Sequence, residues 1–315
     1  MIRFLIRRMA MLVATVLVAS FAIYGALYVS PGSPLSALAG NRPLPAAALA
    51  QLRARYHLDE PFLVRYWHWL TAALHGDLGE SIPLHENVST LIEQRIGVTA
   101  GLVLLTAVII IIAGVGLGLL GALGKGMVDT GVLLTSTVSA ALPSFAAAVV
   151  LQFVFAVKLG WLPALGTGQG FGDSLRHLLL PSLALAATSV ALVTRVTRAA
   201  VREEIGREHV QTAVSRGLPW AGVVRRHVLR NAAIPITTVV GITIASLIAL
   251  SAVVETAFGL NGLGAYLVQA AQDKDVAVVQ GISLVLVLAF VLTNLLVDIL
   301  YAVLDPRIAL GSGAA

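Results

Sequence analysis

The sequence contains no cysteine and little charge of either sign. Asp, Glu, Lys and Arg make up 12% of its 315 residues, whereas about 25% is usual in a soluble domain. The lack of cysteine excludes disulfide scaffolds, thiolate metal sites and cysteine nucleophiles. The lack of charge leaves too few groups to hydrate the surface of a soluble enzyme. With 58% hydrophobic residues, the chain is not intrinsically disordered either.

Motifs for catalysis and for energy supply are missing as well. Gly124-Lys125 resembles the end of a P-loop, but Leu119 and Gly126 stand where that motif needs Gly and Ser/Thr. No H-E-x-x-H or G-x-S-x-G pattern supports an intramembrane enzyme. The histidines match no closed set of metal-ligand spacings. We therefore predict that this chain has no catalytic residue, no metal site and no cofactor of its own.

Long apolar runs are what the sequence does contain, in keeping with a mean hydropathy of +0.90. Six stretches have no charged residue: Met9–Val29, Thr99–Gly124, Gly131–Val157, Leu178–Thr194, Ala232–Val254 and Val276–Val297. A helix needs about 20 residues to cross the hydrocarbon layer, and backbone groups in lipid must bond within their own helix. The sequence therefore predicts the fold class of an all-α polytopic membrane protein with six transmembrane helices.

The distribution of basic residues predicts the orientation. Met9–Val29 follows three arginines, but it is longer than the core of a signal peptide and no small-residue cleavage site follows, so we interpret it as a retained span. With six spans, both termini lie on one side of the membrane. That side also holds eight arginines in the segment Arg195–Arg230. Because short cytoplasmic segments are enriched in Lys and Arg, we expect both termini in the cytoplasm.

The spans divide the chain into three parts: residues 1–30 (the N-terminal tail and first span), an extracytoplasmic insertion at 31–98, and a core at 99–315. Within the insertion we expect a helix from Pro45 to about Tyr56 and another from Pro61 to about Leu74. The second helix carries aromatic residues at helical spacing, which fits either a helix at the membrane surface or a packed external subdomain.

The cytoplasmic segment Arg195–Asn231 is longer than a connector needs to be. A short apolar stripe on a helix is predicted by the spacing of Val210, Ala213, Val214 and Leu218. Gly217 then suits a left-handed helix cap, and Pro219 suits the start of a second helix running to about Arg230. Interspersed glutamates and the small apolar area favour docking to a protein over lying on anionic lipid.

Features within the spans predict how they pack. Small residues repeat every fourth position in two runs, Gly114, Gly118, Ala122 and Gly241, Ala245, Ala249. Such faces let helices approach closely, either within one bundle or between subunits. Pro143 and Pro181 are expected to kink their spans. The candidates for lining a polar path are Gln152, Ser246, Glu255 and Asn294, with interhelical hydrogen bonding as the alternative role.

The run from Glu208 to Pro219, EHVQTAVSRGLP, resembles the EAA loop of ABC-importer permeases in the dipeptide/oligopeptide/nickel form. The similarity extends along the chain, through PGSP at 31–34, RYHLDEP at 55–61, GDLG at 76–79, LGWLP at 159–163, GLG at 262–264 and DPRI at 305–308. The family's Glu-Ala-Ala is replaced here by Gln211-Thr212-Ala213. The pattern is typical of the first of the two permeases in such a system.

This resemblance implies a MetI-like type I importer fold, with 199–231 as the coupling segment. It implies as partners a second homologous permease, two ATPase subunits that bind ATP and Mg²⁺, an extracytoplasmic peptide-binding protein and the lipid of a bacterial inner membrane, but no nucleic acid. The expected ATPase-coupling residues are Glu208, Val210, Gln211, Thr212, Ala213, Val214, Arg216, Gly217, Leu218 and Pro219, with Val210, Val214 and Leu218 as an apolar plug. Peptides are the expected substrates, with haem, a nickel chelate or another small solute as alternatives, and a self-sufficient carrier or channel as an alternative of another class.

Overall fold

The computed structural model describes residues 2–29 and 60–304, and within these ranges the regular elements are helices. In chain order the α-helices are α1 (Ile2–Val29), α4 (Phe62–Leu74), α5 (Val88–Ile109), α6 (Gly116–Leu123), α7 (Met127–Ala141), α8 (Ser144–Leu151), α9 (Gly170–Ile205), α10 (Glu208–Ser215), α11 (Trp220–Val223), α12 (Leu229–Ala257), α13 (Leu263–Gln272) and α14 (Val276–Leu304). Three π-helical segments connect some of them, η1 (Ile110–Val115), η2 (Gln152–Lys158) and η3 (Val224–Val228). The helix predicted from Pro45 to Tyr56 lies outside the described residues.

Five continuous helical runs are long and apolar enough to cross a membrane: α1, α5 through α6, α9, α11 through α12, and α14. A sixth crossing is formed if the bent pair of α7 and α8–η2 counts as one span. The predicted all-helical membrane fold is thus confirmed. The run that holds the second predicted span begins earlier than expected, at Val88 rather than Thr99.

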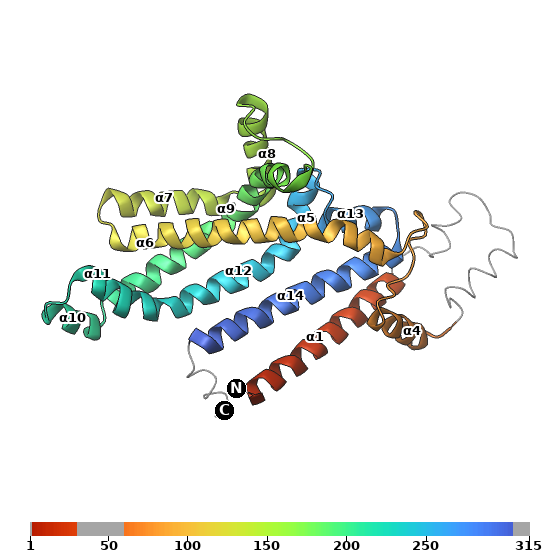
Figure 1. Ribbon diagram of the computed structural model, residues 1–315, viewed down its shortest axis with the longest axis horizontal. Helices are drawn as coiled ribbons and strands as arrows, with labels where there is room; N and C mark the ends of the chain where they lie inside the picture. The colour runs from red at the N-terminus through yellow and green to blue at the C-terminus, as the bar shows by residue number, and fades with distance from the viewer. Residues whose placement is uncertain (1, 30–59, 305–315) are drawn as a thin grey trace, which may run out of the picture.

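The third span is bent at Pro143, where a kink was predicted. Its two halves meet at Leu142-Pro143 with a bend of 102°. Leu142 has an extended ψ of 113° there, as expected for a residue that precedes proline. Pro143 then begins α8, where its missing N–H costs no helical hydrogen bond. One proline at the junction therefore redirects the chain (Figure 1).

Helix α9 is the central helix of the bundle, and it contacts α5, α6, α7, α8 and α12. In the most apolar 18-residue stretch of α9, 61% of the residues are buried. The corresponding share for α1, at the periphery, is 11%. Its 36 residues extend well beyond the predicted span Leu178–Thr194, and Pro181 lies inside it without interrupting the helix. The fourth crossing is therefore longer than predicted, because the helix continues through the arginines that follow Thr194.

Both small-residue faces are used within this chain. A Cβ added at Gly118 would lie 2.5 Å from Cβ of Thr197 on α9, and one at Gly241 would lie 2.2 Å from a Val297 methyl on α14. Real Cβ atoms do not approach this closely, so only glycine permits these helix crossings. Of the two arrangements left open by the sequence, close packing within one bundle is the one found at these positions.

Helix α4 folds back against α1 through its aromatic face. The ring of Phe62 packs against three aromatic rings of α1, and the Tyr66 hydroxyl lies 2.8 Å from the Ser20 hydroxyl. The aromatic spacing of α4 thus reflects packing on the first span. On its other side α1 packs against α14, where Arg8 forms an ion pair with Asp298. The first span is joined to both the insertion and the last described span.

Candidate functional site

A helical corner projects from one end of the bundle, between α9 and α12 (Figure 1). Helix α10 ends at Ser215, and Gly217, two residues further on, has a φ of +75°. The Gly217 N–H donates to the Val214 carbonyl and the Leu218 N–H to the Ala213 carbonyl, at 2.9 and 3.4 Å. This pair of bonds closes a helix with a left-handed glycine. The predicted cap at Gly217 is confirmed.

The second helix of the corner does not end near Arg230 as predicted. Pro219 caps its start, and the helix continues through α11, η3 and α12 to Ala257. No residue between Pro219 and Pro235 lacks a backbone N–H, so nothing in the sequence stops the helix at Arg230. The corner is therefore the direct extension of the fifth span, and a displacement of one displaces the other.

The apolar stripe of α10 is divided between the protein interior and the surface. Val210 and Ala213 are buried in a cluster with Val223, Val228 and other residues of α6, α9 and α12. Val214 and Leu218 are 48% and 47% exposed. The predicted apolar plug is therefore wrong for Val210, which holds α10 against its own chain. Val214 and Leu218 remain available to a partner.

The polar residues predicted to contact a partner lie on the outer side of α10. These residues are exposed: Glu208, Gln211, Thr212 and Arg216. Gln211 donates to the Gly206 carbonyl at 3.3 Å, and the Thr212 hydroxyl donates to the Glu208 carbonyl at 2.9 Å. These two bonds stay within the corner. The charged groups of Glu208 and Arg216 face solvent.

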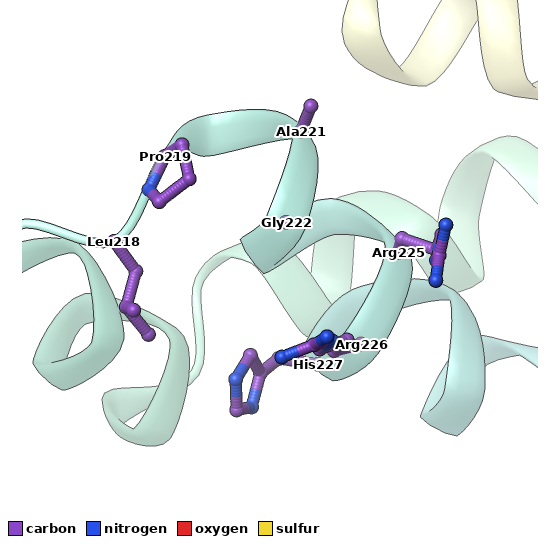
Figure 2. A pocket seen from close by; sticks show the side chains of 7 residues that line it. All are labelled: Leu218, Pro219, Ala221, Gly222, Arg225, Arg226 and His227. Atoms are coloured by element: carbon purple, nitrogen blue, oxygen red, sulfur yellow. The ribbon is translucent and has the colours of Figure 1, made fainter.

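A groove of about 410 Å³ runs along the corner where α10 turns into α11. We name it the corner groove; it is lined by Leu218, Pro219, Ala221, Gly222, Arg225, Arg226 and His227. Figure 2 shows Leu218 and His227 projecting on the same side of the chain, with the Arg225 side chain at the other end of the groove. An apolar edge beside two guanidinium groups fits a partner surface that combines apolar and acidic side chains.

Sequence reasoning missed part of this surface. Arg225 and Arg226 were counted only as basic residues, and Trp220 was not singled out although its side chain is 50% exposed beside the groove. The signal in the sequence that could have identified the two arginines was their distance along the chain from Pro219. Once Pro219 is placed at the start of a helix, residues six and seven further along lie two turns away, within reach of the same corner.

The four predicted path residues do not line one common surface. Gln152 donates to the carbonyls of Ala164 and Ala257 at 3.0 and 3.1 Å, so it holds the loop after η2 against the end of α12. Ser246 donates to the carbonyl three residues before it. Asn294 lies in a small groove between α14 and α1. For Gln152, Ser246 and Asn294 a role in a path stays a prediction, and the bonds seen are local ones within the bundle.

Glu255 is fully buried, which corrects its assignment to an open path. Its carboxylate accepts from the Thr99 hydroxyl at 2.8 Å and from the Ala265 N–H at 2.9 Å. A Cβ added at Gly262 would lie 2.4 Å from this carboxylate. Glu255 thus fixes the first turn of α13 to α5 and α12, at the end of the bundle away from the corner.

A second buried carboxyl group, Asp275, lies just before α14. It accepts from the Ser81 hydroxyl at 2.5 Å and from the Val278 N–H at 3.3 Å. Burial raises the pKa of Asp275, while the hydrogen bonds from Ser81 and Val278 act to lower it. The group ties the segment before α5 to the start of the last span. No three His, Cys, Asp or Glu side chains within the described ranges lie close enough to hold a metal ion.

A bundle of membrane-crossing helices with a helical corner projecting from one end is an arrangement suited to a transport permease. The chain belongs to the family described as binding-protein-dependent transport system inner membrane components, which matches residues 111–310. The N-terminal region of the same family matches residues 1–103. It is therefore a multi-pass inner-membrane permease subunit of an ABC importer, a family that works with ATPase and binding-protein partners.

Relatives agree with this assignment, and a solved structure has a similar fold. The chain is 34% identical to a glutathione transport system permease protein of Escherichia coli over 98% of its length and 99% of the relative's. It is 36% identical to a putative peptide transport system permease protein of Brucella abortus, over 96% and 98%. Its fold is similar to that of the MetNI methionine ABC transporter in inward-facing conformations, with a TM-score of 0.54, 18% identity, and coverage of 68% and 96%.

Proposed function

We propose that this chain forms half of the membrane path of an importer for short peptides, including peptide-like thiols such as glutathione. The observation that carries the proposal is the corner, a firmly capped turn that extends the fifth span and presents an exposed groove. Relatives named for glutathione and peptide transport favour this substrate class over haem or a nickel chelate.

The corner is the proposed docking site for an ATPase subunit. Val214 and Leu218 supply exposed apolar contact, and the two arginines of the corner groove supply positive charge. ATP and Mg²⁺ bind to the ATPase subunits, since this chain has no P-loop. A second, homologous permease completes the path, and an extracytoplasmic binding protein delivers the substrate to the other face.

The orientation that this assignment requires can be tested with thiol labelling. Because the chain has no cysteine, a single introduced thiol is the only reactive one. We expect Gln211→Cys on α10 to react with a membrane-impermeant maleimide only in inverted vesicles. Trp161→Cys, 62% exposed in the loop after η2, should react only in right-side-out vesicles. The reverse pattern would place the corner outside the cell and contradict ATPase docking.

The transport function is tested by reconstitution. The two permeases, the ATPase subunits and the binding protein are purified together and placed in proteoliposomes. We expect ATP-dependent uptake of glutathione, dipeptides or longer peptides from a length series. Uptake of a nickel chelate or haem in place of every peptide would overturn the substrate class. Transport by this chain alone, without ATPase subunits, would identify it as a self-sufficient carrier.

A further inference from the structure

Glu204, in the last turn of α9, is a buried carboxylate at the base of the corner. Its side chain is 12% exposed. One oxygen accepts from the Asn231 amide at 2.8 Å and pairs with Nε2 of His209 at 3.2 Å, and the other pairs with Nε of Arg207 at 3.5 Å. The carboxylate therefore touches the start of α10, the link before it and the first turn of α12.

The position of this carboxylate matters because of what surrounds it. The buried contacts of Val210, Val228 and their neighbours hold α10 near the spans, but apolar attraction is not directional. Hydrogen bonds and ion pairs have preferred geometry and fix relative orientation. A buried carboxylate is also costly unless it is paired. Glu204 is paired on both oxygens, so separating α10 from α9 or α12 would leave part of its hydrogen-bonding capacity unsatisfied.

We propose that Glu204 is a positioning residue for transport, which sets the angle of α10 against α9 and α12 and so transmits movement of the corner to both spans together. This inference rests on the function proposed above. Asn231 is its counterpart on α12: its amide donates both to Glu204 and to the carbonyl of His227 in its own helix. Without this connection, α10 and the fifth span would move while the fourth span follows them less closely.

The test compares Glu204→Ala and Glu204→Gln with Glu203→Gln in the reconstituted complex. Glu203 is the matched control, because it neighbours Glu204, is 71% exposed and pairs with Arg207 at the surface. The measured quantity is substrate imported per ATP hydrolysed. We expect Glu204→Ala to lower this ratio about tenfold, as loss of a buried charged partner implies, and Glu204→Gln to lower it less. Glu203→Gln should leave the ratio unchanged.

Two further readouts separate positioning from general support of the fold. ATP hydrolysis and the yield of assembled complex should stay near the wild-type level in Glu204→Gln. Asn231→Ala should lower the same ratio, and the double variant with Glu204→Ala should be no worse than the more damaging single one. Parallel loss of uptake and hydrolysis with an unchanged ratio would overturn the positioning role. If the wild-type complex itself fails to couple uptake to hydrolysis, the proposed function is what fails.

Discussion

Substitution of Gly217 tests the corner with little interference from packing. An L side chain in the left-handed region costs about 1–2 kcal/mol, and Gly217 has a φ of +75°. No atom lies within 4 Å of a Cβ built there, so the cost of a substitution is conformational rather than steric. The equilibrium constant for closing the corner should fall roughly 5- to 30-fold. We expect ATP-dependent uptake to fall in Gly217→Val, with normal insertion in the membrane.

A graded series and a matched control complete this experiment. Gly217→Asn should retain most uptake, because Asn tolerates the left-handed region, and Gly217→Ala should lie between Asn and Val. Gly160 has a φ of +62° and equally open surroundings in the loop after η2, so Gly160→Val introduces similar strain far from the corner. Wild-type uptake in Gly217→Val, or equal loss in Gly217→Asn and Gly217→Val, would refute the reasoning.

Three other predictions concern stability, measured as the unfolding temperature of the purified protein in detergent. Gly118→Val should force α6 away from α9 and lower the free energy of unfolding by about 1–3 kcal/mol. Gly116→Ala should be neutral, because nothing lies within 4 Å of a Cβ built there. Equal effects of the two substitutions would contradict the close crossing. Tyr66→Phe should cost about 0.5–1.5 kcal/mol and cost less once Ser20 is Ala, because only the longer bond to the Leu17 carbonyl is then lost. Fully additive losses would show that the two hydroxyls are not partners. Because burial raises the pKa of Asp275, the folded chain binds that proton more tightly than the unfolded chain, so stability should fall as the pH rises from the unfolded-state pKa through the higher folded-state pKa. Asp275→Asn should flatten that part of the profile, and an unchanged pH dependence would refute it.

The sequence predicted the approximate positions of the spans because lipid leaves the backbone only helical solutions over long apolar runs. It did not predict where each helix ends. Helix α9 continues through Arg195 and the residues that follow, since charged side chains end the contact with lipid but not the helix. The bend at Pro143 was located, but its 102° could not be foreseen, because the angle depends on which helices the two halves pack against.

At the corner, local chemistry was predictable and burial was not. A glycine cap leaves a signature in the sequence, and Gly217 has the expected conformation. The division of the apolar stripe, with Val210 inside and Val214 outside, depends on how α10 lies against distant parts of the chain. Likewise, the sequence shows Glu255 only as a polar residue at the end of a span. The tertiary fold is needed to show that Thr99 and α13 enclose it.

The packing of α1 on α14 has a consequence for how the protein is made. The first span enters the bilayer long before Asp298, the acidic partner of Arg8, has been synthesised. Before α14 is made, the described contacts of α1 are those of its C-terminal half with the rings of α4. Assembly of the bundle is thus completed when α1 packs against α14. A translation product that stops before residue 276 lacks α14 and therefore this helix interface.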